Sequence, residues 1–107
     1  MRQCIVVEGR ADMLQIAPLV TADVIILKTN GTISEVALEE LVEPYEYLAL
    51  YTLFDADYTG DVLRKLMDRL YPECTHLYID DEDKAVEETP RMKLYALLKD
   101  AAIYVKD

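Results

Sequence analysis

The chain has 107 residues, a length that suits one domain around one hydrophobic core. Hydrophobic residues make up 52% of it and charged residues 30%, an ordinary composition for a globular protein. No apolar run approaches the roughly 18 residues that a membrane span needs, and charged residues appear too early for a signal peptide. We therefore expect a single cytoplasmic domain over residues 1–107, without membrane contact.

The charge is strongly acidic, with 21 Asp and Glu against 11 Lys and Arg and a formal net charge of −10. A domain that grips nucleic acid unaided usually carries a basic face. We therefore expect any nucleic-acid partner, RNA or DNA, to be met through metal ions, a local basic patch or a partner protein.

The chain has two cysteines and one histidine. Cys4 and Cys74 form no CxxC pair and have no metal-ligand spacing, and nothing in the sequence supports a disulfide between them. Cys4 lies in an apolar run, which predicts a small buried side chain. A lone histidine beside a strand is more often structural than catalytic, so we interpret His76 as structural.

Short apolar runs alternate with amphipathic stretches, a pattern typical of a parallel α/β sheet. Residues 4–7 predict a buried strand, and residues 12–19 a short helix that Pro18 ends or bends. Residues 24–27 predict the second strand. A turn over 29–32 follows, and then a helix that ends at Pro44. Thr32 fits its start through a capping box, with Ser34 as the rival cap.

The second half of the chain continues this alternation. Residues 47–54 are almost wholly apolar and predict a central third strand, followed by a helix over 62–70 and a short fourth strand at 76–79. We interpret the acidic residues 80–88 as a solvated loop. A last helix is predicted to start at Thr89-Pro90, and residues 101–105 are predicted to add an edge strand.

Acidic side chains directly follow two of the predicted strands. Glu8 follows the first strand, and Asp55 and Asp57 follow the third. The carboxyl ends of parallel strands form the ligand crevice of such sheets, and Asp55 and Asp57 point to the same side if the chain remains extended. Converging carboxylates repel one another without a cation, and Mg²⁺ prefers oxygen ligands. The spacing therefore predicts a Mg²⁺ site, with the alternative that Asp55 or Asp57 caps the next helix.

Two segments resemble the motifs of the Toprim family. Ile5 to Asp12 is similar to its first motif, a hydrophobic strand ending in Glu-Gly-x-x-Asp, and Asp55 to Gly60 is similar to its second, Asp-x-Asp-x-x-Gly. Within this family, the chain resembles the Toprim half of the ribonuclease that matures bacterial 5S ribosomal RNA, over residues 4–80. It implies a Rossmann-like, three-layer α/β/α Toprim fold with a mostly parallel sheet of four to five strands.

The resemblance also implies roles for the acidic residues and for the first turns. Glu8 would be the general acid/base or a carboxylate that shares the metal. Asp55 and Asp57 would be ligands of Mg²⁺, with Mn²⁺ as an alternative ion. The residues that would support the site are Asp12, Asn30 and Gly31.

Two glycines and two arginines complete the predicted site. By the resemblance, Gly9 and Gly60 would let the main chain approach a phosphate closely. Arg10 and Arg64 would contact the phosphate, because a guanidinium can pair with two of its oxygens. For Arg64 the alternative is a solvated position on the helix face.

These residues leave more than one function open. The first is Mg²⁺-dependent phosphodiester cleavage or phosphoryl transfer on nucleic acid, nuclease-like and directed at RNA processing. The second is a non-catalytic module that binds metal or phosphate and recruits or regulates a nucleic-acid-processing partner, which the acidic surface favours. A receiver-like phosphoacceptor is less favoured, because that fold needs an acidic pair after its first strand and this chain has Glu8-Gly9.

Overall fold

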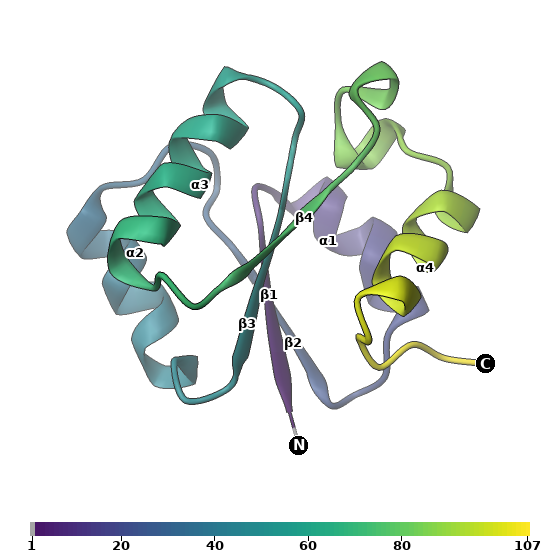
Figure 1. The fold of residues 1–107 in the computed structure, drawn as a ribbon, viewed down its shortest axis with the longest axis horizontal. Coiled ribbons are helices and arrows are strands. Elements are labelled where there is room, and N and C mark those ends of the chain that lie inside the picture. Colours follow the sequence, from purple (N-terminus) through teal and green to yellow (C-terminus); the bar gives the residue numbers. More distant parts are fainter. Residues whose placement is uncertain (1) are drawn as a thin grey trace.

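The fold is that of a computed structural model, which describes residues 2–107. Its strands form one parallel sheet of four strands in the order β2-β1-β3-β4. Helices α1 and α4 cover one face of this sheet, and α2 and α3 cover the other (Figure 1). The predicted three-layer α/β/α architecture is therefore confirmed, with an all-parallel sheet of four strands.

The strands lie close to the predicted positions. They are β1 (Gln3–Val7), β2 (Val24–Lys28), β3 (Ala49–Phe54) and β4 (Thr75–Tyr78). Every residue of β1 is buried, because β1 has a strand on each side and helices over each face. β3 is also an interior strand, as its apolar run predicted.

The main helices are α1 (Arg10–Ile16), α2 (Glu35–Val42), α3 (Tyr58–Leu70) and α4 (Arg91–Asp100). The rival cap Ser34, rather than Thr32, begins α2, because its Oγ accepts a hydrogen bond from the N–H of Ala37 at 3.1 Å. Neither of the first two prolines ends its helix abruptly. Each lies inside a 3-10 turn that extends the helix: η1 (Ala17–Leu19) and η2 (Glu43–Tyr45).

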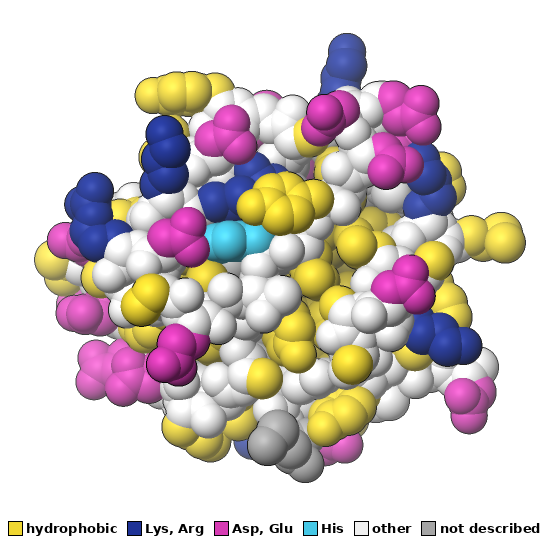
Figure 2. Space-filling model, viewed as in Figure 1, with side chains coloured by type: hydrophobic (Ala, Val, Ile, Leu, Met, Phe, Trp, Pro, Cys, Tyr) yellow, Lys and Arg dark blue, Asp and Glu magenta, His cyan; other side chains and the backbone are white. Residues whose placement is uncertain are grey.

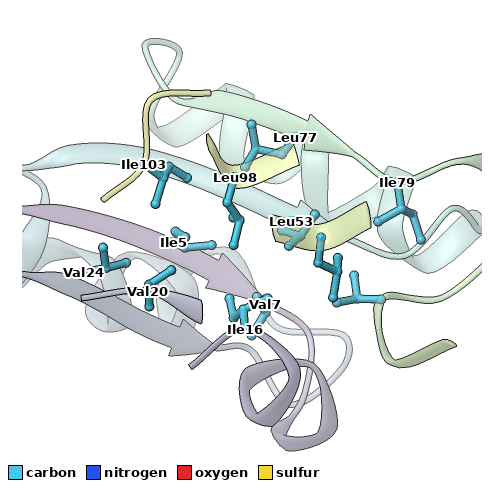
Figure 3. Packing of buried hydrophobic residues seen from close by; sticks show 12 residues of the cluster. Ile5, Val7, Ile16, Val20, Val24, Leu53, Leu77, Ile79, Leu98 and Ile103 are labelled. Carbon is cyan, nitrogen blue, oxygen red and sulfur yellow. The ribbon is translucent and has the colours of Figure 1, made fainter. Parts of the chain in front are cut away.

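Each face of the sheet has its own hydrophobic core, since alternate strand residues point to opposite faces. Figure 3 shows the core beneath α1 and α4, where Ile5, Leu53 and Leu77 of the sheet meet Leu98. The second core lies beneath α2 and α3 and consists of Val6, Leu38, Val42, Phe54, Leu63 and Met67. Cys4 is fully buried and both cysteines are free thiols, as predicted for Cys4.

The carboxyl-terminal quarter differs from the prediction at three points. Residues 101–105 form no strand, because Val105 makes only an isolated antiparallel bridge to Val20. Helix α4 begins at Arg91 rather than at Thr89-Pro90: the hydroxyl of Thr89 donates to the carbonyl of Ala85, and Pro90 is the residue before the helix. Residues 80–88 are not a wholly solvated loop, because they form η3 (Asp81–Asp83) and η4 (Val86–Glu88), and Val86 is fully buried.

Figure 2 shows the molecule from the side of the β4 edge. Acidic and basic side chains are scattered around this face, and hydrophobic side chains gather between the two helical layers. Within residues 2–107, the structure contains no helix with the length and apolar character of a membrane span.

Candidate functional site

The turns that follow β1, β2 and β3 meet where the carboxyl ends of these strands lie, because the strands are parallel. They enclose a hollow of about 320 Å³, which we call the carboxyl-edge hollow. Its lining includes most of the site residues predicted from the sequence. The lining residues are Glu8, Gly9, Arg10, Ala11, Asp12, Asn30, Gly31, Asp55 and Glu87.

Glu8 and Asp55 form the centre of this hollow. The main-chain N–H of Asp55 donates to Glu8 Oε1 at 3.0 Å, so the glutamate at the end of β1 is fixed by the end of β3. In turn, Asp55 Oδ1 accepts from the N–H of Val86 at 2.8 Å. Each carboxylate is thus oriented by a main-chain donor on a neighbouring segment.

Asp12 and the turn after β2 support Glu8 from either side. Asp12 Oδ2 accepts from the N–H of Gly9 at 3.0 Å, which fixes the start of α1. Asn30 and Gly31 have φ angles of 60° and 89°, and the left-handed conformation suits glycine at the second position. The N–H of Gly31 then donates to the carbonyl of Glu8 at 3.2 Å.

Burial and mutual repulsion disfavour the charged form of the carboxylates in this hollow. Burial raises the pKa of Glu8 to about 6, and the charges of Asp55, Asp57 and Asp12 add to the shift. Burial and the charge of Asp55 likewise raise the pKa of Asp12 to about 6. The pKa of Asp55 is also raised, chiefly by burial. Close carboxylates of this kind are stabilised by a cation.

Asp57 lies apart from the carboxyl-edge hollow. Its Oδ1 accepts from the N–H of Gly60 at 2.8 Å, so Asp57 is the N-cap of α3. It lines a neighbouring hollow of about 550 Å³, together with Arg64 and Tyr78. Asp55 and Asp57 thus line different hollows, yet the charge of Asp57 still raises the pKa values of Glu8 and Asp55, so a cation shared by these carboxylates stays a prediction. The alternative of a helix cap is correct for Asp57.

The two glycines of the motifs differ in what they do. A Cβ at Gly60 would lie 2.0 Å from the carbonyl oxygen of Asp55, so the first turn of α3 packs directly on this main chain. Gly60 thus serves the contact between helix and strand and is buried. At Gly9 a Cβ would meet only Asp12 Oδ2, at 3.8 Å, so the main chain there is open to the hollow.

Arg64 is buried, and its guanidinium forms hydrogen bonds within the protein. Its Nη2 donates to the carbonyls of Phe54 and Asp55, each at 3.0 Å, and its guanidinium lies 4.9 Å from the ring centre of Tyr78. Its Nη1 pairs with Asp61 at 2.9 Å. The alternative of a solvated helix face is wrong for Arg64, which is 7% exposed. The guanidinium holds the main chain at the end of β3, so the donors expected to contact a phosphate are engaged inside the protein. Arg10 is exposed beside the hollow.

The segment from Lys84 to Glu87 also belongs to the site, which its sequence did not predict. The carbonyl of Lys84 accepts from the N–H of Ala56 at 2.8 Å, and Val86 donates to Asp55, so this segment packs across the turn after β3. Glu87 contributes a further carboxylate to the hollow. One signal was available: Val86 is a lone large apolar side chain in an acidic run, and such a residue is usually buried.

The acidic residues do not meet in a tight ligand triad. Within residues 2–107, one group of three ligating side chains has donor atoms within 4.8 Å of one another, and it consists of Asp68, Cys74 and His76. A cation at the carboxyl-edge hollow would therefore take part of its coordination from water, as Mg²⁺ commonly does.

Comparison with known proteins identifies the family. No protein-family model matches the chain. A solved small Toprim domain protein from Bacillus stearothermophilus has a TM-score of 0.91 and 40% identity, over 99% of this chain and 90% of that one. The uncharacterized protein YusF of Bacillus subtilis is 35% identical over 105 residues, which are 98% of this chain and 72% of YusF. The chain belongs to the small Toprim domain family.

This small Toprim domain is also related to a larger enzyme. Ribonuclease M5 of Listeria monocytogenes is 36% identical over 80 residues, which are 74% of this chain and 41% of the ribonuclease. Ribonuclease M5 of Bacillus subtilis is 32% identical over 79 residues, with 73% and 41% covered. The chain thus spans less than half the length of these ribonucleases and matches their Toprim part. The resemblance noted in the motifs is confirmed.

Proposed function

We propose that this small Toprim domain binds Mg²⁺ or Mn²⁺ at the carboxyl-edge hollow and acts on the phosphodiester backbone of nucleic acid. One observation carries the proposal. Glu8 is anchored to the main chain of Asp55, beside Asp12 and Glu87, in a hollow where Arg10 is the basic side chain. Such a set of oxygen donors is suited to a hard divalent cation and to the phosphate that accompanies it.

The donor set suits Mg²⁺ in its chemistry. Glu8 and Asp55 would be the direct ligands, because one oxygen of each is fixed by a main-chain N–H and the other remains for a cation. Asp57 would act from the neighbouring hollow through a water molecule, with its other oxygen engaged in the cap. A bound Mg²⁺ would neutralise phosphate charge and acidify a water ligand.

The residues around the hollow have distinct roles in this proposal. General acid/base catalysis is the alternative to direct ligation for Glu8, because its pKa of about 6 in the metal-free protein lies close to neutral pH. Arg10 would contact the phosphate oxygens, and the open main chain at Gly9 leaves room for them. Asp12, Asn30 and Gly31 would hold Glu8 in place.

The relationship to ribonuclease M5 supports nucleic acid as the partner, with RNA first. The net charge of −10 opposes unaided binding to a phosphate backbone. Metal ions or a partner protein would therefore supply the missing positive charge. We further propose that residues 1–107 work as one Toprim domain in the cytoplasm.

A second function is a non-catalytic Toprim module that binds metal or phosphate and recruits or regulates a nucleic-acid-processing partner. The observation in its favour is that few basic side chains lie near the hollow. Arg64 is turned inward onto carbonyls, which leaves Arg10 beside the acids of the hollow. A surface of this kind binds protein partners more readily than bare nucleic acid.

Cleavage assays with variants distinguish the two functions. Structured RNA and single-stranded DNA are incubated with the wild type, Glu8→Gln and the control Glu88→Gln, with Mg²⁺ or with EDTA. An enzyme requires Mg²⁺-dependent cleavage that Glu8→Gln lowers by about 100-fold or more and Glu88→Gln leaves unchanged. If the wild type binds Mg²⁺ but cleaves neither substrate, the result supports the non-catalytic module. Cleavage that survives Glu8→Gln contradicts the assigned role of Glu8.

A further inference from the structure

A second group of ligating side chains lies where α3 ends and β4 begins. Asp68 is near the end of α3, Cys74 is in the connecting turn and His76 is on β4, and their donor atoms lie within 4.8 Å of one another. We call this group the α3–β4 cluster. It shares no residue with the lining of the carboxyl-edge hollow.

The ring of His76 is fixed from both sides. Its Nδ1 pairs with Oγ1 of Thr52 at 2.5 Å, and Thr52 is a fully buried residue of β3 that lies opposite His76 in the sheet. Its Nε2 lies 2.7 Å from Asp68 Oδ1. Histidines that bind metals usually have their other ring nitrogen held in this way. Figure 2 shows the histidine (cyan) at the surface of the β4 edge.

Cys74 and Asp68 complete the cluster, and both approach Nε2 of His76. The Sγ of Cys74 is a free thiol, half-buried, 3.8 Å from Nε2 of His76. The main-chain N–H of Cys74 donates to the carbonyl of Tyr71 at 3.0 Å, which fixes the turn that carries the thiol. The side chain of Asp68 is 57% exposed, so it can rotate without disturbing the core.

These distances are close to those of a tetrahedral metal site. With Zn–S of about 2.3 Å and Zn–N and Zn–O of about 2.0 Å, tetrahedral angles place sulfur about 3.6 Å from nitrogen and nitrogen about 3.3 Å from oxygen. The observed separations are 3.8 Å for sulfur and nitrogen and 2.7 Å for nitrogen and oxygen. To reach the tetrahedral separation from Nε2, the exposed carboxylate of Asp68 would need to move by roughly 0.6 Å.

We propose that Asp68, Cys74 and His76 form a site for a borderline-soft divalent transition metal such as Zn²⁺, with water completing the coordination. Thiolate and imidazole ligands favour such ions over Mg²⁺, which distinguishes this site chemically from the carboxyl-edge hollow. The carboxyl end of α3 adds partial negative charge from its carbonyl groups. Thr52 acts as the positioning residue, because its hydroxyl oxygen can accept a hydrogen bond from the Nδ1–H of a metal-bound His76.

Cobalt provides the test, because a thiolate ligand gives Co²⁺ a sulfur-to-metal charge-transfer absorption. Co²⁺ is titrated into reduced wild type and into Cys4→Ala, in which Cys74 is the only thiol. Both are expected to show the absorption, and Zn²⁺ is expected to abolish it by displacement. Adding Cys74→Ser should remove it. Asp68→Asn and His76→Gln should weaken Co²⁺ binding by about tenfold or more, whereas the exposed control Asp100→Asn should not.

The outcomes that overturn the proposal are equally specific. One is the absence of a thiolate absorption in folded wild type; another is its survival in Cys74→Ser. Unchanged Co²⁺ affinity in Asp68→Asn and His76→Gln would leave the cluster as a structural contact between α3 and β4. Circular dichroism and thermal unfolding confirm that each variant is folded. Asp55→Asn should keep the absorption, so failure here is distinguishable from failure of the proposed Mg²⁺ site.

Discussion

At the scale of single residues, Arg64 has the most distinctive contacts. It is an arginine on an amphipathic helix, yet it is 7% exposed and donates to the carbonyls of Phe54 and Asp55. These carbonyls lie at the end of β3, where the ladder of the sheet stops. Arg64 therefore replaces the donors that a longer strand would have supplied.

Replacing Arg64 by Met should destabilise the domain by about 2–3 kcal/mol, because two carbonyls lose a charged donor. The matched variant is Arg69→Met on the same helix. Arg69 is 71% exposed and pairs with Glu35 at 3.4 Å, so its loss should cost about 0.5 kcal/mol or less. Urea unfolding of both variants checks the difference. Equal losses would contradict the role given to Arg64.

Gly60 should be intolerant of any side chain. Gly60→Ala places a Cβ against the carbonyl oxygen of Asp55, which is main chain and cannot rotate away. We expect a loss of about 1–3 kcal/mol from overpacking. Gly9→Ala should change stability by about 0.5 kcal/mol or less, because its φ of −145° suits any residue and its Cβ has room. A large loss at Gly9 with none at Gly60 would contradict this assignment.

At the scale of elements, the segment from Asp80 to Thr89 joins the candidate site to the rest of the fold. Lys93 of α4 contacts Asp80 and Asp83 at 2.8 and 2.7 Å, and these contacts raise the pKa of Lys93. Val86 anchors the same segment in the core beneath α1 and α4. The acidic segment thus forms a lid that packs over the turn after β3, held by the buried Val86 and by the ion pairs of Lys93.

Val86→Ala should loosen this segment. The loss of a fully buried side chain should cost about 1–3 kcal/mol, and hydrogen exchange should quicken at Ala56 and at position 86, whose N–H groups donate across the contact. Val36→Ala is the control, because Val36 is 66% exposed. If exchange at Ala56 is unchanged in a destabilised Val86→Ala, the lid does not depend on Val86.

At the scale of the whole molecule, the raised carboxyl pKa values predict how stability depends on pH. The pKa values of Glu8 and Asp12 are about 6 in the folded state, against ordinary values of about 4. Between those values the folded state binds more protons than the unfolded chain does. The contribution of these two groups to the free energy of unfolding therefore falls as pH rises from about 4 to about 6, and remains lower above that.

Thermal unfolding in EDTA checks this dependence against Glu8→Gln, which keeps an oxygen to accept from Asp55. At pH 7.5 Glu8→Gln should raise Tm by on the order of 4 °C, and the difference should vanish near pH 4. Mg²⁺ should raise the Tm of the wild type at pH 7.5 and much less at pH 4.5, because it binds the ionised carboxylates. A Glu8→Gln variant less stable than the wild type at pH 7.5 would contradict the prediction.

Most of the fold could be predicted from the sequence, and the failures have both local and long-range causes. The strands and helices follow from local apolar patterns, and Glu8 and Asp55 come together because parallel strands end at one edge. The docking of Val86 onto Asp55 spans 31 residues and is not visible in local patterns. The cap of Asp57 on Gly60 and the contact of Arg64 with Phe54 span only 3 and 10 residues, and they depend on how the chain turns after β3. Residues 101–105 are apolar enough for a strand, yet Val105 meets only Val20.

The central claim is that the acids of the carboxyl-edge hollow bind a divalent cation, and calorimetric titration with Mg²⁺ and Mn²⁺ tests it most directly. The samples are the wild type, a folded Glu8→Gln/Asp55→Asn double variant, and Glu39→Gln as a control on the exposed face of α2. We predict binding at millimolar Mg²⁺ by the wild type and the control, weakened by on the order of tenfold or more in the double variant. Equal binding by all three proteins, or none by the wild type, would contradict the claim and leave these carboxylates with a purely structural role.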